Sequence, residues 1–157
     1  MTIEAFASCF KTNYKVKLKI LGDGVLRKEL EELVREYGIE EQVLFEGRVA
    51  REVVVEELQK ANVFVLPSDY ETFGVVYIEA MACGVPVIGT KNGGAEDIIS
   101  YKNGLLIEKN SVSLLAEAMM AIYKEHRKFN CEEIAKECQQ LYGQKVIREK
   151  ILQTYVK

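Results

Sequence analysis

Two glutamates, Glu71 and Glu79, lie eight positions apart in the stretch SDYETFGVVYIEAMACG, which begins as a loop and becomes apolar. A carboxylate among apolar neighbours needs a partner, because burying an unpaired charge is costly. Carboxylates accept hydrogen bonds from vicinal hydroxyl groups, such as those of a sugar or a ribose. The two acids are therefore candidate ligands for a hydroxyl-rich molecule. The alternatives are a solvated helical glutamate for Glu79 and an ordinary loop acid for Glu71.

The residues between the two acids have the chemistry of a phosphate site. Gly74, after Phe73, lets the backbone approach a ligand closely. The helix that follows would present unpaired backbone N–H groups and the positive end of its dipole, which together favour an anion. If that helix begins at Gly74 or Val75, the Glu79 side chain leans back toward its N-terminus. Both carboxylates would then face one ligand.

The elements that must position these residues alternate between short apolar runs and helical patterns. Residues 51–60 and the segment from 111 onward have helical periodicity, and Gly38 ends a helix that follows the first strand. This alternation predicts an α/β fold with a mostly parallel sheet flanked by helices. The runs VFVLP and VPVIG are almost entirely apolar, so we expect them to be central strands. The predicted strands cover residues 16–21, 43–45, 63–66, 85–89 and 104–107.

Ligands of open parallel sheets bind beyond the carboxyl ends of the strands. The candidate ligand-binding loops are therefore the four that follow predicted strands: residues 21–25, 46–50, 67–74 and 89–97. In the last of these, Asn92, Gly93 and Gly94 either approach a ligand or form a turn. Glu96 and Asp97 would be the first-turn acids of a helix.

Composition excludes several classes of protein. The chain has 157 residues, 48% of them hydrophobic, which suits one soluble domain. A net charge of −3 with scattered basic residues argues against nucleic-acid binding. Four cysteines without ligand spacing and one histidine give no metal site. Without a signal-peptide pattern or an apolar run that spans a membrane, we expect a cytoplasmic protein.

Beyond these patterns, one long segment resembles a known family. LPSDYETFGVVYIEAMACGVPVIGTKNGGAEDII is similar to the nucleotide-sugar-binding core of the retaining glycosyltransferases of family 4, the glycosyl transferases group 1, which have the two-domain GT-B architecture. The similarity includes the family's pattern of two glutamates separated by seven residues. It continues through KILGDGVLRKELEELVREYGIEEQVLFEGRV upstream and NGLLIEKNSVSLLAEAM downstream, and so covers nearly the whole chain. The implied fold is a Rossmann-like parallel sheet flanked by helices.

The resemblance also implies roles for individual residues. Glu79 would bind the ribose hydroxyls of the donor nucleotide, and Glu71 would contact hydroxyls of the transferred sugar. The remaining residues implied to bind the donor sugar are Thr72, Phe73 and Gly74. Those implied to bind the nucleotide or its phosphates are Gly22, Gly24, Arg48, Val49, Val75 and Val76. For Gly22 and Gly24, a tight turn after the strand is an equally good interpretation.

No residue is assigned as a catalytic nucleophile or base. The chain contains no Asp-x-Asp pair, so we expect a metal-independent site. The nucleotide-diphosphate sugar would be a substrate, and no cofactor is expected. The domain's contribution to catalysis would be electrostatic stabilisation of the departing diphosphate.

The chain departs from the family pattern at its start. The family domain opens with a further strand and a loop carrying a Gly-Arg and a Lys-Gly pair, whereas TIEAFASCF resembles the helix after that loop. We therefore expect residues 1–157 to be one N-terminally truncated donor-binding domain, inactive alone, which needs an acceptor-binding domain or a separate subunit. Pairing of the flanking strands, or a strand from another chain, would close the sheet, and unpaired edges would favour self-association.

Two other functions stay open. A non-catalytic binding or interaction module is favoured by the missing basic loop. An NAD-binding domain is suggested by Gly22-Asp23-Gly24 with Glu46 downstream, but Arg27 stands where the third glycine of that fingerprint belongs.

Overall fold

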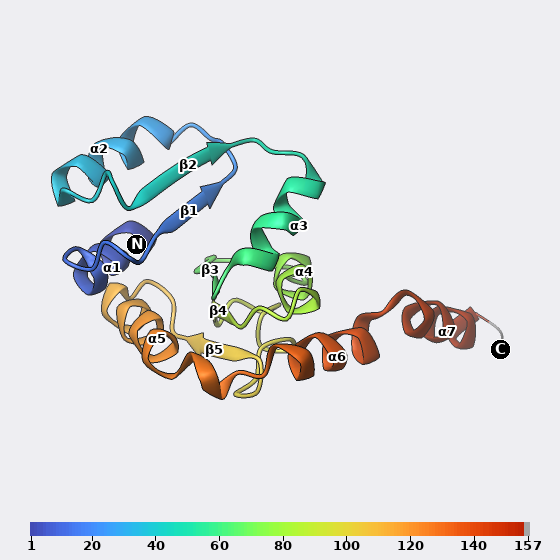
Figure 1. Ribbon diagram of the computed structural model, residues 1–157. Coiled ribbons are helices and arrows are strands. Elements are labelled where there is room, and N and C mark those ends of the chain that lie inside the picture. The colour runs from blue at the N-terminus through green and yellow to red at the C-terminus, as the bar shows by residue number, and fades with distance from the viewer. Residues whose placement is uncertain (156–157) are drawn as a thin grey trace.

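The computed structural model describes residues 1–155 (Figure 1). Helices and parallel strands alternate, as the sequence predicts, and the predicted bounds of α3 and β5 are confirmed. The elements in chain order are α1 (Thr2–Phe10), β1 (Leu18–Leu21), α2 (Arg27–Tyr37), β2 (Val43–Gly47), α3 (Arg51–Lys60), β3 (Phe64–Leu66), α4 (Val75–Ala82), β4 (Val87–Thr90), β5 (Gly104–Ile107), α5 (Val112–Glu125), the 3₁₀ helix η1 (His126–Lys128), α6 (Cys131–Tyr142) and α7 (Gln144–Tyr155).

The helix ends follow local capping rules. Gly38 ends α2 in the left-handed conformation, with φ of 62°, which a residue without a Cβ adopts at little cost. The Ser111 hydroxyl accepts a hydrogen bond from the Leu114 N–H at 3.2 Å and so caps α5. The Asn130 side chain caps α6 in the same way.

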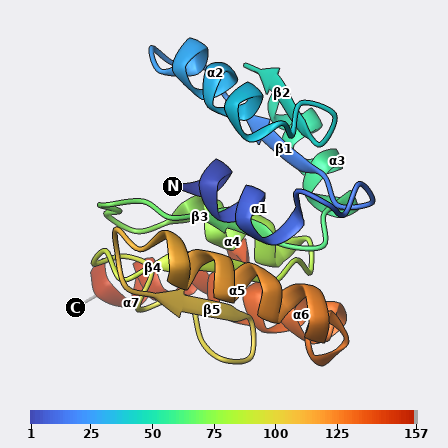
Figure 2. The same ribbon diagram turned by 90° about the vertical axis from the view of Figure 1, so that its left-hand side faces the viewer.

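The strands form two parallel sheets rather than the single sheet expected from the sequence. β1 pairs with β2 in one, and β3, β4 and β5 pair in that order in the other. Figures 1 and 2 show the β1–β2 pair standing apart from the other sheet. Within residues 1–155 no pairing joins β1 to β3, so direct closure of the sheet by these strands is not observed.

One helix connects the two sheets. α1 lies beside α5, and its buried Phe6 and Phe10 belong to a core cluster that also includes Val43 of β2 and Ile88 of β4. The buried Gln42 side chain donates to the Phe10 carbonyl at 2.9 Å and fixes the end of α1. Hydrophobic burial on α1 therefore holds the two sheets in one body.

A second core cluster lies between α4 and α6 around Tyr77, whose side chain is completely buried. β4 contributes to it and is buried along its whole length, which confirms that VPVIG is a central strand. The expectation that VFVLP is central was wrong for this structure, because β3 is the edge of its sheet and its three residues are half-buried.

Within residues 1–155, no helix is both long enough and apolar enough to cross a membrane.

The close β4–β5 pairing leads to a stability prediction. A Cβ added at Gly104 would lie 2.1 Å from the Val87 carbonyl oxygen, whereas one added at Gly24 would meet nothing within 4 Å. We expect Gly104→Ala to lower the free energy of unfolding by about 1–3 kcal/mol, as overpacking does. Gly24→Ala should change it by about 0.5 kcal/mol or less. Urea unfolding followed by circular dichroism measures both, and equal effects of the two substitutions would contradict the packing described for this sheet.

Candidate functional site

The N-terminus of α4 is the centre of the candidate site. Gly74 is the N-cap residue, buried and left-handed with φ of 79°, so α4 begins where the sequence predicts. A Cβ on Gly74 would lie 2.7 Å from the Tyr77 ring, which adds a steric reason for glycine here. The first N–H groups of α4, those of Val75 and Val76 among them, have no partner within the helix and point out from its start. Val75 and Val76 are both exposed.

Glu79 lies one turn into α4 and has the partner that its apolar surroundings predict. The Arg51 guanidinium, at the start of α3, contacts Glu79 Oε1 at 2.9 Å. Glu79 is partly buried, while Arg51 is 81% exposed. The ion pair ties the loop after β2 to α4. Arg51 was not predicted from the sequence as part of the site. A signal for it was present, because a basic residue at a helix start is unfavourable with the helix dipole and so points to an acidic partner.

The loop before α4 packs against the loop after β4. The Ser68 hydroxyl donates to Glu71 Oε1 at 3.2 Å. A Cβ at Gly94 would come within 2.8 Å of the Glu71 carbonyl oxygen and 3.0 Å of the Phe73 nitrogen, so only glycine allows the two loops to pack this closely. Phe73 is half exposed and meets the Tyr142 ring edge-on. Thr72 is exposed.

Asn92 organises the supporting loop. Its buried side chain accepts from the Ala95 N–H at 3.1 Å and donates to the Ser68 carbonyl at 3.3 Å. The turn interpretation of residues 92–94 is therefore confirmed. The expected helix start at Glu96 and Asp97 was wrong: these residues lie in a turn, where Glu96 Oε2 accepts from the Gly93 N–H at 2.9 Å.

The loops after β1 and β2 meet each other at the same edge of the fold. The Gly22 N–H donates to the Gly47 carbonyl at 2.7 Å. Gly22 has φ of 118°, which supports its role in a tight turn, and Gly24 is exposed. Arg48 is exposed and Val49 is half-buried, just before the helix that carries Arg51. A series of contacts therefore runs from Gly22 through the second loop to Glu79.

Burial raises the pKa of Tyr77 to about 12, and the charges of Glu71 and Glu96 act in the same direction, although a hydrogen bond with Asn92 opposes them. The Tyr77 hydroxyl donates to the Leu66 carbonyl at 2.6 Å, so it joins the end of β3 to α4. This tyrosine, which the sequence analysis did not single out, fixes the direction in which α4 starts.

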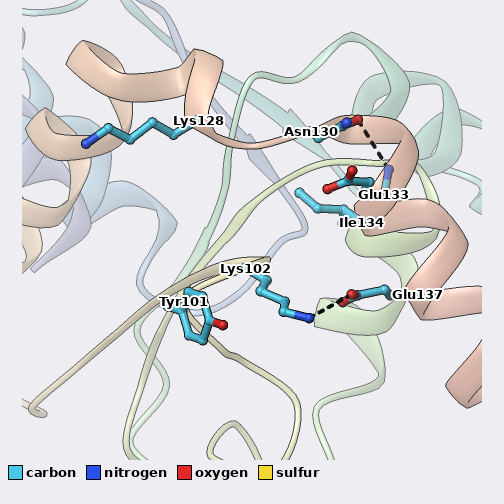
Figure 3. A pocket seen from close by; sticks show the side chains of 7 residues that line it. All are labelled: Tyr101, Lys102, Lys128, Asn130, Glu133, Ile134 and Glu137. Carbon is cyan, nitrogen blue, oxygen red and sulfur yellow. Dashed lines mark hydrogen bonds and ion pairs between the residues drawn. The ribbon is translucent and has the colours of Figure 1, made fainter.

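Two hollows lie away from these residues. One of about 260 Å³ is drawn in Figure 3, where Lys102 points to Glu137. Its lysines already have acidic partners, Glu137 for Lys102 at 3.2 Å and Glu125 for Lys128 at 2.8 Å. The other, of about 610 Å³, lies between α4 and α6 and includes Ile78 and Tyr142. None of the residues predicted to bind the donor lines either hollow.

Among the described residues, no group of three or more His, Cys, Asp or Glu side chains is arranged to hold a metal ion. Metal independence stays a prediction.

Comparison with known proteins gives one family. The profile of the family "Glycosyl transferases group 1" matches residues 1–140. Among curated proteins, N-acetyl-alpha-D-glucosaminyl L-malate synthase of Bacillus anthracis is 35% identical over 153 residues, which cover 94% of this chain and 39% of the relative.

Solved structures have the same fold. Anabaena Alr3699/HepE in complex with UDP-glucose superimposes with a TM-score of 0.85 at 26% identity, over 98% of this chain and 43% of that one. The C-terminal domain of a glycosyl transferase group 1 family protein (LpcC) from Francisella tularensis has a TM-score of 0.78 at 26% identity, over 89% of this chain and 76% of that domain. The chain therefore has the α/β fold of the C-terminal domains of GT-B glycosyltransferases and spans about two fifths of the length of these relatives.

The buried Tyr77 hydroxyl leads to a prediction for alkaline pH. Its pKa is about 12 in the folded chain and about 10 when unfolded. The unfolded state therefore loses this proton first, and the free energy of unfolding should fall as pH rises from about 10 to about 12.

Tyr77→Phe should remove that part of the pH dependence. It should also cost about 1 kcal/mol at pH 7 through the lost hydrogen bond. Tyr101→Phe, at an exposed position, is the matched control and should behave as the wild type. Urea unfolding at pH 7, 10 and 11 measures these effects. If the free energy of unfolding of Tyr77→Phe falls with pH above 10 as steeply as that of the wild type, the Tyr77 hydroxyl is not the group responsible.

Proposed function

The chain belongs to the glycosyl transferases group 1 family, and from that premise we propose that it is the donor-binding half of a glycosyltransferase. It would bind a nucleotide-diphosphate sugar. In the complete enzyme the glycosyl unit would pass to an acceptor hydroxyl with retention at the anomeric carbon.

The observation that carries this proposal is the placement of Glu71, Gly74 and Glu79 around one helix N-terminus. The backbone N–H groups at the start of α4 would hold the diphosphate, and the α4 dipole would stabilise negative charge that develops on it as the sugar leaves. Because these donors are part of the backbone, they need no reorganisation during the reaction.

The acids on either side of this N-terminus would orient the donor. One carboxylate oxygen of Glu79 accepts from Arg51. Since a carboxylate accepts several hydrogen bonds, Glu79 can still accept from the ribose hydroxyls. Arg51 would place a positive charge beside the diphosphate. Glu71, steadied by Ser68, would accept from hydroxyls of the sugar, next to Thr72 and Phe73.

The loops that meet at Gly22 and Gly47 would complete the nucleotide side. Arg48 and Val49 would lie beside the base, and Gly22 and Gly24 beside the diphosphate. No side chain is assigned as nucleophile or general base, and the site would work without a metal ion or a cofactor.

The acceptor side would come from a second domain or a separate subunit, because the chain spans 39% of the curated relative and 43% of HepE. Ligand sites commonly form between domains. A site split in this way would be open in one half, which agrees with the exposure of Phe73, Val75 and Val76. Transfer activity is therefore proposed for the complete assembly, in the cytoplasm, and inactivity for this chain alone.

A non-catalytic module that binds nucleotide sugars is the second candidate. Two cations beside the site are already engaged, since Arg51 pairs with Glu79 and the Lys109 ammonium donates to the Asp69 carbonyl at 3.2 Å. Weak binding of the diphosphate would fit a module that senses a nucleotide sugar better than an enzyme that turns it over.

Isothermal titration with UDP, GDP, ADP and their sugar conjugates tests the donor site. We expect one nucleoside diphosphate to bind and Glu79→Gln to weaken it by about tenfold or more, as the loss of a charged hydrogen-bond acceptor does. Glu52→Gln removes the same charge next to Arg51, on the exposed side of α3, and should leave the affinity unchanged.

Failure of every nucleoside diphosphate to bind, or equal affinity in Glu79→Gln and wild type, would overturn the proposal. NAD is included in the titration, and binding of NAD alone would favour the dinucleotide interpretation. Binding without transfer after the acceptor half is added would favour the non-catalytic module.

A further inference from the structure

Arg27, the first residue of α2, has a guanidinium group that is held at several points beside the end of β2. Its Nη2 donates to the Phe45 carbonyl at 3.3 Å, and its central carbon lies over the Phe45 ring, 5.5 Å from the ring centre. Its Nε donates to Glu31 Oε1, one turn further along α2, at 2.8 Å. The hydrogen bonds and the ring contact together fix both the position and the plane of this side chain.

The remaining nitrogen of the guanidinium lies against the backbone where β2 ends. A Cβ added at Gly47 would lie 3.3 Å from Arg27 Nη1, so the two groups pack directly on each other. The Gly47 carbonyl in turn accepts the hydrogen bond from the Gly22 N–H at 2.7 Å, and the Arg27 N–H donates to the Gly24 carbonyl at 3.1 Å. Arg27 therefore braces the end of β2 and the loop after β1 against each other.

The contacts of Arg27 depend on the shape of its side chain more than on its charge. A positive charge in the first turn of a helix is unfavourable with the helix dipole, so charge alone does not explain an arginine here. A guanidinium is flat and carries several donors in a rigid arrangement, so it can lie on an aromatic ring and donate in its own plane at the same time. A lysine in this place would keep the charge but could not make these contacts together.

We propose that Arg27 is a positioning residue for recognition of the nucleotide base. It fixes the backbone at Gly47, and thereby the direction in which Arg48 and Val49 leave β2. The inference rests on the proposed function, in which Arg48 and Val49 lie beside the base. A loop that is fixed before the ligand arrives discriminates between bases, because it does not rearrange to accommodate one that fits poorly. Arg27 acts through this loop and does not itself touch the ligand.

Isothermal titration with UDP, GDP and ADP measures base selectivity as the ratio of the highest affinity to the next. We expect Arg27→Gln to lower this ratio by about fivefold, because a binding loop that is no longer preorganised accepts the bases more evenly. Arg27→Lys should lower it to a similar extent, since it keeps the charge and loses the planar group. Lys28→Gln removes the same charge from the next, exposed position and should keep the wild-type ratio.

Hydrogen–deuterium exchange of the ligand-free chain tests the connection through Gly47. The Gly22 amide, which is bonded to the Gly47 carbonyl, should exchange about fivefold faster in Arg27→Gln and Arg27→Lys than in the wild type, because local opening becomes easier. Lys28→Gln should exchange as the wild type does. The amide of Ile88, in the buried strand β4, should stay protected in every variant, which shows that each of them is folded.

Several results would overturn the positioning role of Arg27. They are equal affinities of the wild type for the three nucleotides, wild-type selectivity in either Arg27 variant, and a loss of affinity by one common factor for all three. Lost selectivity with unchanged Gly22 exchange would mean that Arg27 acts on the ligand directly, and would overturn it too. If the wild type binds none of the nucleotides, the proposed function fails and the role of Arg27 fails with it. If the wild type binds one selectively and the Arg27 variants do the same, only the role of Arg27 fails.

Discussion

The packing of α1 between the two sheets is the interaction on which the rest of the structure depends. No strand pairing joins β1–β2 to β3–β4–β5 among the described residues, so the burial of Phe6 and Phe10 carries the connection. The Phe10 ring lies 5.2 Å from that of Tyr123 on α5, and Cys9 Sγ donates to the Ala116 carbonyl at 3.2 Å. These contacts fix the C-terminal end of α1 on α5, and Gln42, just before β2, bonds to the same end from the β1–β2 side.

This packing brings the carboxyl ends of strands from both sheets to one edge. There the Gly22–Gly47 hydrogen bond joins the loop after β1 to the end of β2, and the Arg51–Glu79 pair joins the start of α3 to α4. The Asn92 turn supports the loop before α4. α4 and the loop before it are therefore held by the start of α3 and by the loop after β4. An anion site made from a helix terminus depends on this rigidity, because its donors act only if they are already aimed at the ligand.

Much of this arrangement could be predicted from sequence, because the signals are local. The strand at 104–107, the helix at 51–60, the Gly38 cap and the start of the helix after Gly74 all follow from periodicity and glycine geometry. The need of Glu79 for a partner also followed, but its partner Arg51 is 28 positions away and no local pattern identifies it. The edge position of β3 and the turn at Glu96 were missed for the same reason, since strand order and loop-to-loop hydrogen bonds depend on distant residues. Residue roles that rest on family resemblance, such as those of Arg48 and Val49, stay predictions.

A ¹H–¹⁵N correlation spectrum of the chain titrated with UDP, GDP and ADP tests most directly whether the α4 N-terminus binds a nucleoside diphosphate. We expect one of these nucleotides to shift the backbone amide signals of Phe73, Gly74, Val75 and Val76 in a saturable way. The amide signals of Tyr101 and Lys102, beside the hollow in Figure 3, should not move. Shifts confined to that hollow, or none at the α4 N-terminus with any of the three, would contradict this expectation.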